Sequence, residues 1–194
     1  LRMLLVHDET GWEQAAAVRA VLEERGHHVT PCNCPQDKAA LRGALNVGGY
    51  HILHIISEGC DGGTMDVAGG LSANTLGGML EEISPRPRLV FLSVCWSAGH
   101  LGLSLLDKGV KAVIAMRYPV TRLGMVEGAP AFYTALLEEG KDVVESMAVL
   151  YHALAKRKGR PKLDLLDIQS PALYLATQRP GRLPDPLPFQ AMEA

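Results

Sequence analysis

Cys95 stands directly after an apolar run at 88–94, and Glu58 with Gly59 stands directly after a second apolar run at 50–57. Runs of β-branched and aliphatic residues that break into small and polar residues are typical of buried strands leading into functional loops. In open α/β sheets, sites collect at the carboxyl ends of such strands. A cysteine thiolate at such an end is suited to attack an electrophilic carbonyl carbon. The sequence therefore predicts a candidate site at Cys95, with Glu58 and Gly59 at a second strand end.

Strands and helices are expected to alternate along the chain. Thr10 and Glu13 match a capping box, in which each residue satisfies a free N–H at the start of a helix that ends at Gly26. Gly77 and Gly78 weaken the expected helix at 71–83. The expected strands are 2–7, 28–30, 50–57, 88–94, 111–116 and 172–177, and the other expected helices are 35–46, 102–108, 126–139 and 142–157. This alternation predicts an α/β fold, a mostly parallel sheet with helices on both faces.

Composition and charge exclude several classes of protein. The 194 residues, 47% of them hydrophobic, fit one domain, expected at 1–178 and followed by a Pro-rich tail at 179–194. The net charge is −2 and basic residues form no long run, so no nucleic-acid partner is expected. No apolar stretch approaches the roughly 20 residues of a membrane span, so no membrane partner is expected either. Four cysteines in a chain of this size indicate reduced thiols and a cytoplasmic location.

No cofactor and no metal ion are expected. Cys32 and Cys34 are separated by a single residue and lack a second matching pair, which is weak evidence for a metal or redox site. The Gly-rich stretches at 60–63 and 68–70 are not followed by the Lys and Ser or Thr that a phosphate-binding loop requires. We expect this Gly-rich segment to form the rim of a substrate groove.

A set of motifs between Tyr50 and Thr177, in order and spacing, resembles the CHAT domain, a bacterial relative of caspases and separase among the clan CD cysteine peptidases. The resemblance rests on 53–59 (Leu-His-Ile-Ile-Ser-Glu-Gly), 93–95 (Ser-Val-Cys), 109–115 (Gly-Val-Lys-Ala-Val-Ile-Ala), 132–140 (Phe-Tyr-Thr-Ala-Leu-Leu-Glu-Glu-Gly) and 170–174 (Ser-Pro-Ala-Leu-Tyr). The resemblance implies a caspase-like three-layer α/β/α sandwich.

The resemblance also implies roles for individual residues. Cys95 takes the position of the nucleophile, and the N–H groups of Gly59 and Cys95 take that of the oxyanion hole. Glu58 stands where the family carries the catalytic histidine. A carboxylate raises the pKa of a nearby thiol, whereas an imidazolium would lower it, and an ionised Glu is a poor acid for the leaving amine. Arg117 and Tyr118 fall in the region that borders an extended substrate in these enzymes.

Other histidines are weaker candidates for the missing base. His54 lies four residues before Glu58, about 13 Å away along an extended strand, and is expected to be a core histidine. His100 follows Cys95 by five residues and could fold back over the thiol, although a loop histidine is more often solvated.

Three functions stay open on the sequence alone. The favoured one is a catalytically impaired pseudoprotease that binds a peptide or partner protein and regulates a bacterial protease or defence system. Its partner is expected to include a regulatory subunit supplied in trans. The alternatives are an active cysteine endopeptidase that uses Cys95 with Glu58 or His100, and an α/β domain that binds a small ligand.

Overall fold

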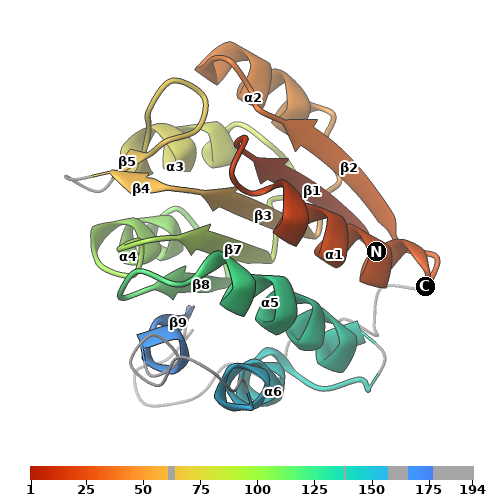
Figure 1. The fold of residues 1–194 in the computed structure, drawn as a ribbon. Helices are drawn as coiled ribbons and strands as arrows, with labels where there is room; N and C mark the ends of the chain where they lie inside the picture. The colour runs from red at the N-terminus through yellow and green to blue at the C-terminus, as the bar shows by residue number, and fades with distance from the viewer. Residues whose placement is uncertain (61–63, 138, 157–165, 177–194) are drawn as a thin grey trace.

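A six-stranded sheet forms the centre of the computed structural model, which describes residues 1–60, 64–137, 139–156 and 166–176 (Figure 1). The strand order is β2-β1-β3-β7-β8-β9, and only β9 runs antiparallel to its neighbour. The strands are β1 (Arg2–His7), β2 (His28–Asn33), β3 (Ile52–Ser57), β7 (Leu89–Val94), β8 (Ala112–Met116) and β9 (Pro171–Leu175). A mostly parallel sheet brings the carboxyl ends of its strands to one edge, as the sequence predicted.

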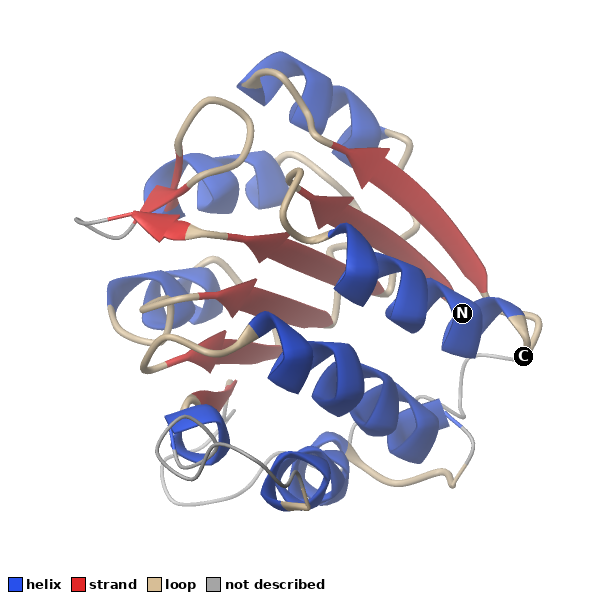
Figure 2. Cartoon of the chain, in the orientation of Figure 1, coloured by secondary structure: helices blue, strands red, loops and turns tan. Residues whose placement is uncertain are grey.

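Helices cover both faces of this sheet and complete three layers (Figure 2). One face carries α1 (Trp12–Glu23), α5 (Arg122–Leu137) and α6 (Val143–Ala155), and the other carries α2 (Lys38–Asn46), α3 (Ala73–Glu81) and α4 (His100–Asp107). Each face has its own core, because alternate residues of a strand point to opposite faces: Leu4 packs into one core and Met3 into the other. Every residue of β3 and of β7 is buried, which explains their continuous apolar sequences.

A second, small antiparallel sheet follows β3 at its carboxyl end. Its strands are β4 (Gly59–Cys60), β5 (Thr64–Met65) and β6 (Leu71–Ser72). The start of the segment expected to be partly helical at 71–83 is therefore β6, and α3 begins only after it. Gly77 lies inside α3 where a Cβ would meet the Lys108 side chain at 2.9 Å, so close packing against α4 gives this glycine a role.

The predicted capping box at Thr10 and Glu13 is wrong. Gly11 precedes α1 without any side-chain cap, and the Thr10 hydroxyl donates to Asp8 Oδ1 at 2.7 Å instead. A capping box does occur at the start of α6, where Asp142 and Glu145 each accept a hydrogen bond from the other's backbone N–H. Thr10 is not the N-cap because α1 begins one residue later, at Trp12, which makes Gly11 its N-cap.

Two helices begin earlier in the sequence than expected. Helix α4 begins at His100 rather than at 102, and α5 begins at Arg122 rather than at 126. Both helices therefore start closer to the strand that precedes them, and the connecting loops are short. The expected ends at Arg157 and Thr177, and the tail at 179–194, lie outside the described residues.

In the described part of the chain, no helix combines the length and the apolar character that crossing a membrane requires.

Candidate functional site

The register of β3 and β7 brings Glu58 and Gly59 beside Cys95. Ser57 pairs with Val94 across these parallel strands, so the next residues leave the sheet together. A Cβ on Gly59 would overlap the backbone carbonyl of Cys95. Only glycine fits this close approach of the two backbones. The structure thus places the three residues predicted to form the site at adjoining strand ends.

The Cys95 thiol is half-buried, and the backbone N–H groups of Val120, Cys95 and Gly59 lie close enough to it to lower its pKa. Burial raises the pKa of this thiol, and the negative charge of Glu58 raises it further, while the three N–H groups lower it. The net direction is upward, so the thiol is neutral at neutral pH. Converging N–H groups are nevertheless the arrangement that holds a carbonyl oxygen or an oxyanion.

Glu58 itself is exposed, and its backbone is held from both sides. Its N–H donates to Asp8 Oδ2 at 3.0 Å, and its carbonyl accepts from the N–H of Asp66 at 2.9 Å. The other Asp8 oxygen accepts from Thr10 and from the N–H of Gly11. Burial raises the pKa of Asp8, but the hydrogen bonds from Thr10, Glu58 and Ser57 outweigh it and keep the carboxylate ionised.

Asp8 was missed in the sequence. Its position directly after the first predicted strand was the available signal, because the β1 end lies next to the β3 end in this sheet.

His54 is a core histidine, as expected. It is completely buried, its Nε2 lies 3.0 Å from Ser93 Oγ and its Nδ1 lies 3.1 Å from Tyr133 Oη. Gln14 of α1 joins the same network through a hydrogen bond of 2.7 Å to Ser93. Burial lowers the pKa of His54 to about 3, so the ring is neutral. The network ties α1 and α5 to the two strands that carry Glu58 and Cys95.

His100 is exposed and begins α4. Among the residues that the structure describes, no histidine hydrogen-bonds to the Cys95 thiol.

Aromatic side chains border the thiol on the side of β8. Trp96 directly follows Cys95, has a φ of +61° and is 58% exposed. Its indole contacts Tyr118 edge to face, with ring centroids 5.8 Å apart. A left-handed conformation at a bulky residue is strained and is characteristic of functional sites. Tyr118 had been predicted as a substrate-binding residue, whereas Trp96 had not.

Arg117 is exposed, and its charge acts on Tyr151 of α6. Burial raises the pKa of the Tyr151 phenol in α6, and the nearby Arg117 charge lowers it. The Tyr151 hydroxyl donates to the carbonyl of Pro171 at 2.7 Å. Of the two residues predicted to bind substrate, Tyr118 contacts Trp96 beside the thiol.

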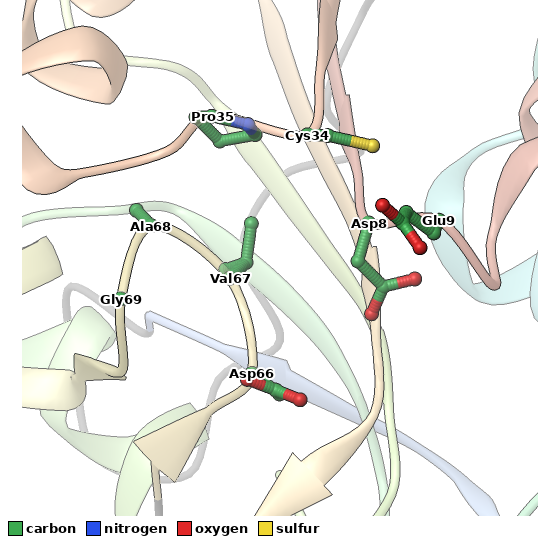
Figure 3. A pocket seen from close by; sticks show the side chains of 8 residues that line it. All are labelled: Asp8, Glu9, Cys34, Pro35, Asp66, Val67, Ala68 and Gly69. Carbon is green, nitrogen blue, oxygen red and sulfur yellow. The ribbon is translucent and has the colours of Figure 1, made fainter.

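Two hollows adjoin these residues. The larger, about 170 Å³, is lined by Asp8, Glu9, Cys34, Pro35 and 66–69 (Figure 3). The carboxyl groups of Asp8, Glu9 and Asp66 give it an acidic wall, and the Asp8 and Asp66 contacts with Glu58 place it beside the site. The smaller hollow, about 10 Å³, lies between Cys95, Trp96 and Leu101 on one side and Thr64 and Met65 on the other.

Metal ligation finds no support in the described residues. They contain no group of three or more His, Cys, Asp or Glu side chains arranged to hold a metal ion. Cys34 is exposed and lines the acidic hollow, while Cys32 is half-buried, which raises the pKa of its thiol.

Two solved structures share this fold. The crystal structure of gingipain R, an Arg-specific cysteine proteinase, superimposes with a TM-score of 0.65 and 13% identity, over 88% of this chain and 45% of that one. Separase from Saccharomyces cerevisiae, in its complex with securin, gives 0.55 and 10% identity, over 90% of this chain and 12% of that one. The chain thus spans less than half of either protein. Among curated proteins, none matches this chain.

The sequence itself matches one family model. The CHAT domain model covers residues 6–167, from the end of β1 to the segment before β9. The likeness to gingipain and separase agrees with it and confirms the predicted caspase-like α/β fold. This chain belongs to the CHAT domain family.

Proposed function

We propose that this chain is a caspase-fold protein that binds an extended peptide or a partner protein and lacks ordinary cysteine-protease activity. The observation that carries the proposal is the position of Glu58, which precedes Gly59 beside the Cys95 thiol. Cysteine proteolysis requires a base that generates the thiolate and then protonates the leaving amine. An ionised carboxylate at this point opposes the thiolate and has no proton to give at neutral pH.

Peptide binding does not depend on the missing base. The N–H groups around Cys95 can donate to a substrate carbonyl oxygen, and Trp96 with Tyr118 offers exposed aromatic surface next to them. The acidic hollow on the Asp8 side favours a basic side chain. We therefore propose that the bound peptide carries an apolar residue beside a basic one. The Arg specificity of gingipain R is consistent with this.

A bound peptide has few free backbone groups to pair with in the loop after β8, residues 117–121. The N–H of Arg117 donates to the Ser170 carbonyl at 2.7 Å, and the N–H and carbonyl of Tyr118 both bond to the Ser170 hydroxyl. These groups are not free to pair with an added strand. The peptide is therefore held here through side chains, chiefly that of Tyr118 in this loop and that of Trp96, which contacts Tyr118.

A regulatory role follows from binding without cleavage. A protein that binds the peptide segment cleaved by an active protease protects that segment from cleavage. A protein that binds the protease itself can also control it in trans. The separase–securin complex shows that separase, which shares this fold, has a protein partner. We propose the same kind of protein partner here, within a bacterial protease or defence system.

Covalent labelling of Cys95 tests the absence of activity. Acyloxymethyl-ketone peptides ending in Arg or in Glu are incubated with the chain and with its Glu58→His, Glu58→Gln and Cys95→Ala variants, and adducts are measured by mass spectrometry. We expect labelling only in Glu58→His, because Gln removes the negative charge without supplying a base. If the unaltered chain is labelled and Cys95→Ala is not, the chain is an active protease. His100 would then be the next candidate for the base.

Binding is measured separately on the Cys95→Ala chain. A fluorescent peptide of alternating Leu and Arg is compared with one in which Glu replaces Arg, by fluorescence anisotropy. We expect the Arg peptide to bind more tightly, and Asp66→Asn to reduce the difference. Equal binding of both peptides, or none, would contradict the proposed recognition of a basic side chain.

A further inference from the structure

The loop that follows β8, residues 117–121, is held in place by a short segment that precedes β9, residues 167–170. Ser170 bonds to the backbone of Arg117 and Tyr118 at one end of the loop. Asp167 bonds to Thr121 at the other end, accepting from its N–H at 2.6 Å and from its hydroxyl at 2.5 Å. Asp167 and Ser170 are both completely buried. The two segments thus form one rigid unit beside the thiol.

Thr121 transmits this anchoring to helix α5 as well. Its hydroxyl oxygen accepts from the N–H of Gly124 at 3.0 Å, and its carbonyl accepts from the N–H of Met125 at 3.2 Å. These are the bonds of a helix-capping threonine, and they fix the backbone on the C-terminal side of the loop. A carboxylate that accepts two hydrogen bonds from the same residue restricts both its backbone and its side chain.

Val120 immediately precedes Thr121, and its N–H lies close enough to the Cys95 sulfur to lower the pKa of the thiol. The same loop also contacts the residue after Cys95, because the ring of Tyr118 packs against that of Trp96. The other two N–H groups at the sulfur come from Gly59 and from Cys95 itself, which are set by the β3–β7 register. Val120 belongs to neither strand. Its placement depends on the loop, and the loop depends on the segment before β9.

We propose that Asp167 is a positioning residue for Cys95, which holds Thr121 so that the Val120 N–H stays beside the sulfur. Asp167 makes no contact with the thiol; it acts through Thr121 and Val120. The proposal concerns the thiol and the loop alone and does not depend on peptide binding or on the role of Glu58.

Loss of this anchor lets the Val120 N–H leave the sulfur. A hydrogen bond to a charged group stabilises the thiolate, so its loss raises the pKa of Cys95, by about one for a single bond of this kind. The rate of alkylation below the pKa falls less than tenfold, because a more basic thiolate is also more nucleophilic. The pKa from a full pH profile, rather than the rate at one pH, is therefore the quantity to measure.

Iodoacetamide alkylation of the intact chain measures this pKa without any recognition of substrate. Trypsin releases peptide 89–108, in which Cys95 is the sole cysteine, and peptide 26–38, in which Cys32 and Cys34 serve as internal controls. We expect Asp167→Ala to raise the pKa of Cys95 by about one and to leave the profile of the control peptide unchanged. Thr121→Val is expected to shift it in the same direction, and Thr121→Ser to restore it.

Ser146→Ala is the matched control for the loss of a buried hydrogen bond. Ser146 is also completely buried, but it bonds to Asp142 in α6, away from the thiol. This variant is expected to lose stability without any change in the Cys95 profile. A Cys95 pKa that stays the same in folded Asp167→Ala would overturn the proposal. If Asp167→Ala does not fold, the two Thr121 variants decide instead. The same Cys95 pKa in Thr121→Val as in Thr121→Ser would overturn the proposal.

Discussion

Gly59 and Cys95 approach each other so closely that a methyl group on Gly59 would overlap the Cys95 carbonyl. This contact joins the ends of β3 and β7, and it brings the Gly59 N–H close enough to the Cys95 thiol to lower its pKa. The contact between these two backbone segments therefore brings the parts of the site together without any side-chain contact. Substitutions at this contact affect the fold as well as the chemistry.

Gly59→Ala is expected to lower the free energy of unfolding by about 1–3 kcal/mol, because the added methyl must displace backbone rather than a flexible side chain. Urea unfolding followed by circular dichroism measures the change. Gly43→Ala is the control, since a Cβ at Gly43 in α2 meets no atom within 4 Å. That variant is expected to be neutral or stabilised by up to about 1 kcal/mol. Equal stability of the two variants would show that the close approach is relaxed in solution.

Glu58→Gln is expected to lower the pKa of Cys95, because it removes a negative charge that raises this pKa. The backbone bond between Glu58 and Asp8 is retained in the variant. The pH dependence of Cys95 alkylation measures the shift. Glu9→Gln is the control, because Glu9 is exposed and does not contribute to the Cys95 pKa. A similar shift in both variants would point to the overall charge of the surface instead of Glu58.

His54 is expected to make folding sensitive to acid. In the unfolded chain a histidine is protonated below about pH 6.5, whereas burial keeps the pKa of native His54 at about 3. Between these values the unfolded state binds a proton that the native state does not, so stability is lost as pH falls from 6.5 toward 3. The loss from this residue approaches about 1.4 kcal/mol for each pH unit.

Urea unfolding at pH 7.5, 6 and 5 compares the unaltered chain with His54→Gln. The variant is expected to be less stable at pH 7.5, since Ser93 and Tyr133 lose a buried partner, and its stability should fall less steeply with acid. His28→Gln is the control, because His28 is exposed and its removal should leave the slope unchanged. Parallel slopes for the chain and His54→Gln would contradict the buried neutral ring.

Trp96→Ala is expected to weaken binding of the Leu/Arg peptide by at least about tenfold, because an exposed aromatic anchor next to the site carries much of the binding energy. Anisotropy titrations on the Cys95→Ala chain measure it. Trp12→Ala is a matched control, since Trp12 and Trp96 are both 58% exposed and Trp12 begins α1. The same loss in both variants would argue against a specific role for the Trp96–Tyr118 pair.

Much of the fold could be predicted because the central strands are buried on both faces. Continuous apolar runs marked β3, β7 and β8, and the break into polar residues at Glu58 and Cys95 marked the strand ends. Helix starts were less predictable. Thr10 matched a local capping pattern, but the Asp8 carboxylate, which also binds the N–H of Glu58, takes its hydroxyl.

The sequence by itself determined the order of the central strands and their helices, although not the small sheet of β4, β5 and β6. It also determined the CHAT resemblance and the presence of Glu58 before Gly59, where the family carries a histidine. Tertiary structure alone decided which groups surround the thiol. Asp8 reaches Glu58 across 50 residues, and Asp167 reaches Thr121 across 46. Hydrogen bonds between residues so far apart leave no periodic pattern, because they depend on strand order and loop packing. The N–H groups at Cys95 are likewise backbone groups, which every residue type except proline supplies, so no residue letter announces them.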